Sequence, residues 1–278
     1  NLRFEEVGAK WGFDDKHDGN GMALGDFDND GDDDLYVVNG FSTPGTTFDD
    51  DFNVTPDRFF ENPGDGSPWR ERAADFGMDR HTLGRAVQPF DFDRDGDLDL
   101  LLAVHAGSPV LWENVVGSRN GWLRVSVRHI GVGSVRMRVE NSTPSLNAVV
   151  RVWPTAECKR PMTRVIGVGG AHYLGTGEPV AHFGLGSDAP ETVHRVHIAW
   201  ANMAGAQIDL ADVPTRQTLA VTAPPLEAHQ SLPRESGLVN PSLAWTASGS
   251  YGQCPTVLSS LLKPLPQSRA VHLVFGYE

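Results

Sequence analysis

Two acidic stretches of nine residues constrain the fold of this chain more than any other feature. Residues 26–34 read DFDNDGDDD, and residues 91–99 read DFDRDGDLD, 65 residues later. The same offset aligns the flanking residues without a gap from position 4 to about position 39. A second shared phrase follows, RFFEN at 58–62 and VLWEN at 110–114. Such a repeat predicts a stacked or radial architecture, because one unit cannot bury its apolar face alone.

Both repeat units are predicted to consist of β-strands. Short apolar runs, LYVVN and LLLAV, follow the acidic stretches directly and leave no room for a helix before the next turn. The first unit spans about 4–62 and the second about 69–114. The first also carries an extra segment at 42–57, whose Pro, Gly and Asp content predicts a surface insertion.

The spacing of the carboxylates predicts a metal site in each stretch. Counting the first Asp as position 1, carboxylates fall at positions 1, 3, 5 and 9, and a glycine that permits a sharp turn falls at position 6. Hard oxygen ligands in this number suit Ca²⁺, whereas Zn²⁺ would need His or Cys, and neither loop contains them. We therefore predict two calcium sites, with these ligands: Asp26, Asp28, Asp30, Asp34, Asp91, Asp93, Asp95 and Asp99.

Asp32 and Asp97 are also counted among the residues of the predicted metal sites, and these two and Asp33 are expected to point to solvent or to add charge behind the direct ligands. The loops are not EF-hands, because position 12 is Val37 in one and Leu102 in the other, where an EF-hand needs a bidentate Glu. The alternative is a pair of solvated acidic turns, which recurrence of the whole pattern in register disfavours. Calcium is expected to act as a folding ligand, because it relieves the crowding of four carboxylates in each loop.

The repeats resemble a known family. The segments GMALGDFDNDGDDDLYVVNG (21–40) and GRAVQPFDFDRDGDLDLLLAV (84–104) are similar to FG-GAP, or VCBS-type, repeats, the calcium-binding blades of integrin-α-like β-propellers. NGWLRVSV (120–127), GVGGAHYLGTGEPVAHFGLG (167–186) and VHRVHIAW (193–200) resemble the ASPIC/UnbV domain. That domain follows such repeats in the cartilage acidic protein-like family. The resemblance implies an incomplete ring, because a propeller needs at least about four blades to close.

The predicted fold class is all-β, in three parts. Residues 1–119 hold the two calcium-binding propeller-type repeats, and residues 120–223 alternate apolar and polar side chains as an antiparallel β-sandwich does, with an extra hairpin at 129–147. Residues 224–278 are a Pro-rich linker and tail. The closing run AVHLVFGYE is expected to form a strand, either on this sheet or on the edge of another chain.

Histidines and arginines of the second domain are the remaining candidates for chemistry. We interpret His172, His182, His194 and His197 as packing residues rather than ligands or bases, because no catalytic motif accompanies them. The arginines are interpreted as a solvated strand face, with a docking surface for an acidic partner or glycan as the alternative: Arg124, Arg128, Arg136, Arg138, Arg151 and Arg164.

Composition limits the possible partners and compartments. The net charge of −13 argues against nucleic acid and against an anionic membrane surface. No apolar run approaches the ~18 residues of a membrane span. The polar start NLRFEEVG is compatible with a removed leader before Asn1. Cys158 and Cys254 form either one long-range disulfide or two buried thiols, and the sequence leaves both open.

We therefore predict an extracellular or periplasmic, calcium-binding structural or adhesive module rather than an enzyme. It is expected to dock onto a protein or glycan surface as a subunit of a larger assembly. Two alternatives stay open. One is an enzyme with a site between repeats and sandwich, which would use Asp49, Asp50, Asp51 or the histidines with calcium as scaffold or Lewis acid. The other is an integrin-like recognition head whose contact is loop 41–57.

Overall fold

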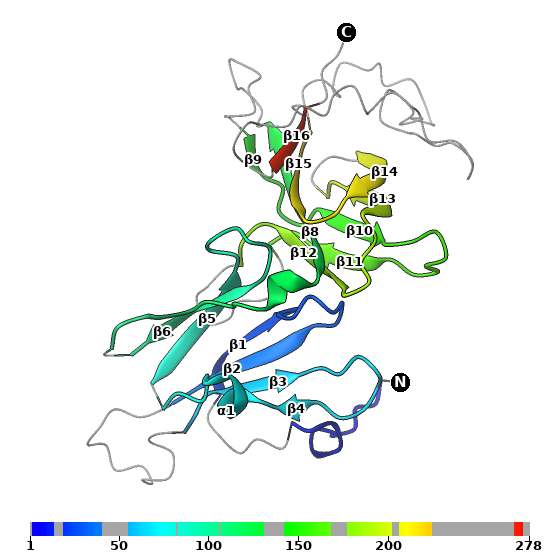
Figure 1. The fold of residues 1–278 in the computed structure, drawn as a ribbon. Helices are drawn as coiled ribbons and strands as arrows, with labels where there is room; N and C mark the ends of the chain where they lie inside the picture. Colours follow the sequence, from blue (N-terminus) through cyan, green and yellow to red (C-terminus); the bar gives the residue numbers. More distant parts are fainter. Residues whose placement is uncertain are drawn as a thin grey trace. The chain divides into compact units, whose positions relative to one another are not determined.

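The computed structural model describes residues 2–13, 19–40, 55–81, 83–105, 107–130, 142–167, 177–201 and 206–223, and the backbone of 270–274. The chain divides into two compact units, the first comprising 1–120 with 169–178 and the second 121–168 with 179–278. The all-β prediction is confirmed, and the described strands form four open sheets without closing a barrel (Figure 1). Among these residues no helix has the length and apolar character that crossing a membrane requires.

The first unit contains two antiparallel sheets, ordered β1-β2-β3-β4 and β5-β6-β7. Its elements are η1 (Ala9–Trp11), β1 (Gly19–Gly25), β2 (Asp34–Asn39), β3 (Arg58–Glu61), β4 (Arg70–Glu71), α1 (Ala73–Phe76), β5 (Gly84–Phe90), β6 (Asp99–Val104), β7 (Val110–Trp112) and η3 (Gly117–Arg119). The sequence repeat is also a structural repeat. β1 and β5 pair with β2 and β6 through the same register shift, after Gly19 in one and Gly84 in the other.

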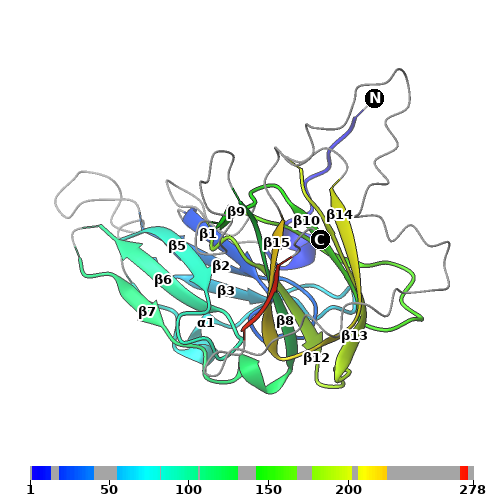
Figure 2. The same ribbon diagram turned by 90° about the horizontal axis from the view of Figure 1, so that it is seen from above.

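One apolar core joins the two sheets of the first unit. Ala23, Tyr36 and Val38 from the first sheet pack with Leu100 and Leu102 from the second, and the two sheets lie side by side in both views (Figures 1 and 2). Small residues on β1 permit this approach, since a Cβ added at position 21 would lie 3.2 Å from the Cα of residue 86. The opposite face of β1 is exposed.

The second unit contains a four-stranded antiparallel sheet, β11-β10-β13-β14, and a second sheet, β12-β8-β15-β16, with β9 beside β8. Its elements are β8 (Gly121–Ile130), β9 (Ser142–Pro144), β10 (Val149–Trp153), β11 (Met162–Val165), β12 (Ala181–Gly186), β13 (Thr192–Ala199), β14 (Gln207–Pro214), β15 (Gln217–Ala223) and β16 (Ala270–Val274). Residues of both sheets form one buried apolar core that includes Val125, Val150, Phe183, Ile198 and Val221, as a sandwich requires.

The second sheet of this unit differs from the predicted antiparallel order. β15 runs parallel to β8, and β16 runs parallel to β15, so the sheet is mixed. The tail strand therefore returns to this sheet, which was one of the two expected outcomes. β8 and β9 pair antiparallel at Arg128–Pro144 and Ile130–Ser142, as the predicted hairpin requires. Its connecting residues 131–141 lie outside the described part.

Candidate metal centre

The two acidic loops curl in the same way. Each joins the first two strands of its sheet, and each turns through two left-handed residues at positions 4 and 6. The φ angles are 58° at Asn29 and 108° at Gly31, against 67° at Arg94 and 98° at Gly96. Glycine takes such angles freely and asparagine takes them more readily than most residues. The repeated spacing thus encodes one loop conformation twice.

The curl brings together three of the four predicted ligands in each loop, and Asp34 and Asp95 are the predicted ligands outside these groups. Asp26, Asp28 and Asp30 each offer an oxygen within 4.8 Å of the others. In the second loop Asp91, Asp93 and Asp99 do the same. Together the two sets occupy positions 1, 3, 5 and 9 of the repeat. Oxygens on opposite sides of a Ca²⁺ ion, with bonds of about 2.3–2.6 Å, lie about 4.6–5.2 Å apart, so this all-carboxylate donor set fits calcium.

The closing aspartate at position 9 is held by backbone amides in both loops. Asp34 Oδ2 accepts from the amide of Phe27 at 3.3 Å, and its Oδ1 accepts from the amide of Asn62 at 2.8 Å. The equivalent bonds join Asp99 to the amides of Phe92 at 2.9 Å and Asn114 at 2.8 Å. The shared phrase RFFEN/VLWEN therefore ends on the residue that fixes position 9.

Further amides hold the other carboxylates. Asp26 accepts from the amides of Asp30 at 3.0 Å and Gly31 at 2.9 Å, one on each oxygen. The amides of Asp30 and Asp32 donate to the carboxylates two residues before them, at 3.1 and 2.9 Å, and the second loop repeats this pattern at 3.2 Å. The ligand set is thus pre-arranged by the backbone.

Burial makes the free carboxylates costly. It raises the pKa of Asp26 to about 7, with Asp30, Asp28 and Asp33 adding repulsion and the Gly31 amide opposing it. Burial likewise raises the pKa of Asp34 to about 8 and of Asp99 to about 6. The first loop therefore carries like charges in a poorly solvated place, which a divalent cation would neutralise.

The side chains expected to point to solvent behave differently in the two loops. Asp32 is exposed and Asp33 half-buried, but Asp97 is fully buried. Its Oδ2 accepts from the amide of Ser118 at 2.9 Å, and burial raises its pKa to about 8. Asp97 therefore does not point to solvent, and of its two expected roles only that of charge behind the ligands remains. The Gly117–Arg119 turn, which has no recognisable signature in the sequence, lies against it.

Two of the predicted histidines, His182 and His197, take structural places in the second unit. His182 is buried, and its pKa is lowered to about 3, first by burial and then by Arg124 and Arg164. His197 Nδ1 lies 3.2 Å from Asp209 Oδ1, which also accepts from Arg195 at 2.6 Å. His194 is exposed. His172 and the acidic run Asp49, Asp50 and Asp51 lie outside the described residues.

The predicted solvated arginine face is partly wrong. Arg124 is buried, Arg128 donates to the hydroxyl of Ser142 at 2.8 Å, and Arg164 donates to the carbonyl of His182 at 3.2 Å. Arg151 is half-buried, whereas Arg136 and Arg138 lie outside the described residues. Several of these arginines are thus built into the fold.

Cys158 is half-buried beside Thr155. Cys254, the other cysteine of the possible disulfide, lies outside the described residues.

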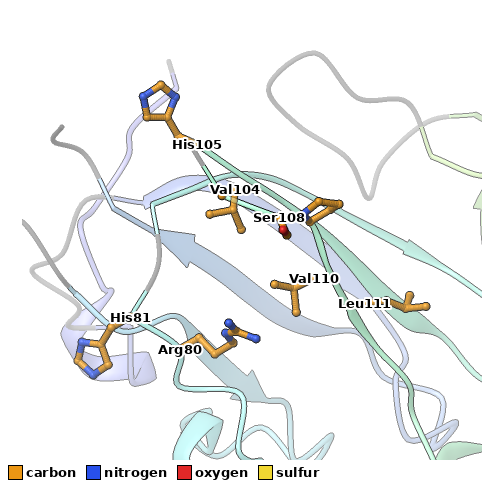
Figure 3. Close-up of a pocket in the computed structure, with 9 residues that line it drawn as sticks. Arg80, His81, Val104, His105, Ser108, Val110 and Leu111 are labelled. Atoms are coloured by element: carbon orange, nitrogen blue, oxygen red, sulfur yellow. The ribbon is translucent and has the colours of Figure 1, made fainter. Parts of the chain in front are cut away.

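An open groove of about 630 Å³ lies in the first unit. Arg80, His81 and His105 line it together with Val104 and Val110. The two imidazoles lie on opposite sides of the groove and do not point toward one another (Figure 3). This is not the arrangement of a catalytic acid–base pair, which requires the groups to converge on one reacting atom.

Comparison with known proteins supports part of the resemblance. Residues 138–228 match the family described as ASPIC and UnbV. Cartilage acidic protein 1 of Xenopus tropicalis is 33% identical over 178 residues, which cover 60% of this chain and 23% of that protein. The chain thus spans less than a quarter of that relative's length. The ASPIC/UnbV resemblance is confirmed, and the FG-GAP resemblance of the repeats stays a prediction.

Proposed function

We propose that this protein is a calcium-stabilised binding module whose first unit consists of two propeller-type FG-GAP blades. One observation carries the proposal. Two loops, 65 residues apart, share the paired backbone amides on Asp34 and Asp99 and the two amide bonds to the carboxylates at positions 3 and 5. Solvated acidic turns would not need this shared clamp. The aspartates at positions 1 and 9 of each loop are buried, whereas those at positions 3 and 5 are exposed or half-buried. Carboxylates held in place by backbone amides in this way are what a cation site needs.

In each acidic loop the aspartates would hold one calcium ion, and the ion would offset the repulsion between their negative charges. Asp26, Asp28, Asp30 and Asp34 would ligate one calcium, and Asp91, Asp93, Asp95 and Asp99 the other. When bound, each ion supplies two positive charges to a loop that otherwise carries uncompensated carboxylates. At a calcium concentration of roughly 100 times the Kd, the gain is about 2.7 kcal/mol per site. The ions therefore act on folding rather than on a reaction.

An extracellular or periplasmic location and a docking role follow as parts of the same proposal. Calcium modules outside the cytoplasm work with dissociation constants of about 10⁻⁴–10⁻³ M, because calcium is abundant there. Docking is supported by apolar side chains that the first unit leaves uncovered, among them Met22 and Leu24 on β1 and Leu101 and Leu111 on the second sheet. We propose a protein or glycan surface as the partner, within a larger assembly.

Thermal unfolding with and without calcium tests the proposal. The full chain, stripped of metal, is expected to unfold at a higher temperature in millimolar calcium than in chelator. Magnesium at the same concentration should raise the transition less, because it prefers octahedral sites that keep several waters. A transition that ignores calcium would overturn the proposed function and leave the acidic stretches as solvated turns.

A further inference from the structure

Hydrogen bonds that cross between the repeats tie the two acidic loops together. Asn29, at position 4 of the first loop, is fully buried. Its Nδ2 donates at 3.1 Å to the carbonyl of Gly96, which is position 6 of the second loop, and at 3.1 Å to the carbonyl of Gly117. Arg94, the position-4 residue of the second loop, is exposed instead. The first loop therefore extends the side chain of Asn29 into the second loop, whereas Arg94, at the same position of the second loop, does not extend into the first.

The last residue of the second repeat and the segment that follows it complete the link from the other side. Asn114 Nδ2 donates to the carbonyl of Phe27 at 2.6 Å, and Asn120 Nδ2 donates to the carbonyl of Asp28 at 2.8 Å. Asn114 Nδ2 also donates to the carbonyl of Leu98 in its own loop at 3.3 Å, as its repeat counterpart Asn62 does to the carbonyl of Asp33 at 3.2 Å, so the bond to Phe27 is an additional one that crosses between the loops. Positions 2, 3 and 4 of the first loop are thus anchored to the structure that surrounds the second.

Close packing makes this link stiff. Gly117 sits between the loops, and a Cβ added there would lie 2.3 Å from the Phe27 carbonyl oxygen and 2.8 Å from the Asp97 Cβ. Neither distance is tolerated between non-bonded atoms, so the space admits only glycine. A shift of the backbone in one loop is consequently transmitted to the other rather than absorbed by a gap.

We propose that the two loops bind their cations cooperatively and that Asn29 is the positioning residue that couples them. The inference rests on the proposed calcium function. Filling the second loop fixes the backbone around Gly96, and hence the acceptor that holds Asn29. Because Asn29 lies between the ligands Asp28 and Asp30, the first loop is then already ordered when its own ion arrives. The second binding event loses less conformational entropy, which is positive cooperativity.

Matched glycine substitutions test the coupling. Asn29→Gly and Arg94→Gly change the same position of the repeat, and both sites have positive φ, so glycine fits without strain. Calcium titration of the full chain against a chromophoric chelator should give two ions and a Hill coefficient of about 1.4–1.8 for the parent chain. R94G should keep that value. N29G should still bind two ions, but with a coefficient of about 1 and one site weakened about 5- to 150-fold.

A double-mutant cycle separates coupling from a local defect. Asp93→Ala disables the second loop, and it should lower the calcium affinity of the first loop by the same factor as N29G does. When N29G is already present, adding D93A should leave the calcium affinity of the first loop unchanged. Asn120→Ala, which removes one cross-loop bond, serves as a milder variant if N29G does not fold. Two independent sites in the parent chain would overturn the coupling and leave the proposed function intact. No bound calcium at all would overturn both.

Discussion

Replacing Asp26 by asparagine should change the stability of the protein in opposite directions with and without calcium. The side chain is 1% exposed, and burial raises its pKa from 3.8 to about 7. One pKa unit corresponds to about 1.36 kcal/mol, so at pH 8 the ionised Asp26 lowers the free energy of unfolding of the metal-free protein by about 4 kcal/mol. An amide keeps one acceptor and loses one of the two bonds from Asp30 and Gly31, which costs about 1–3 kcal/mol. The net expectation in chelator is a gain of about 1–3 kcal/mol.

In calcium the sign should reverse. The amide oxygen that D26N introduces carries no charge and is a weaker ligand, so the variant forfeits most of the stabilisation that the first site supplies, about 2.7 kcal/mol at 100 times the Kd. Differential scanning calorimetry at pH 8, in chelator and in calcium, measures both effects on the calcium-responsive transition. Asp32→Asn is the matched control, because Asp32 is exposed in the same loop and should change stability by less than about 0.5 kcal/mol in either condition. A D26N protein that is less stable in chelator would refute the reasoning.

Three more outcomes are expected. In chelator, the stability measured by urea unfolding should fall as the pH rises from about 4 to about 8. The carboxyls of Asp26 and Asp34, whose pKa is raised from 3.8 to about 7 and about 8, stabilise the folded state only while they are protonated; calcium should remove this trend. Ile198→Ala should destabilise the second unit by about 2–5 kcal/mol and leave the number of bound calcium ions unchanged, which calorimetry and dialysis can check. Tyr36→Phe should cost about 1–3 kcal/mol in chemical denaturation, since the hydroxyl lies 3.2 Å from the buried carboxylate of Asp57.

The conformation of the acidic loops was predictable from the sequence because the information that specifies it is local. Ligand spacing and the glycine turn depend on nine consecutive residues, and repetition at a fixed offset makes chance agreement improbable. The cross-loop contacts were not accessible in this way. Asn29 occupies a variable position of the pattern, and its partner Gly96 is 67 residues away. Asn62 and Asn114 both end the shared phrase, and this recurrence in the sequence indicates a common role. In the structure their backbone amides donate to the position-9 aspartates, Asp34 and Asp99.

The fold was predicted at the level of strands but not of strand order. Alternation shows which face of a strand is buried, and it predicted the β-strand character of the second unit. It cannot show which neighbour a strand pairs with. β15 begins three residues after β14 ends, which favours a hairpin, yet it joins the other sheet and runs parallel to β8. The sequence also predicted that Arg124 faces solvent, because polar residues alternate with apolar ones along its strand. That prediction is wrong because both faces of β8 are buried along the first half of the strand.

Counting the calcium ions bound to the full chain tests the central claim most directly. Native mass spectrometry of the metal-stripped protein, titrated with calcium, resolves each ion as a separate mass step. Two ions per chain, falling to one in Asp28→Ala and to one in Asp93→Ala at a calcium concentration that saturates the remaining loop, is the predicted result. A chain that binds no calcium, or whose bound calcium is unaffected by either substitution, would contradict the account.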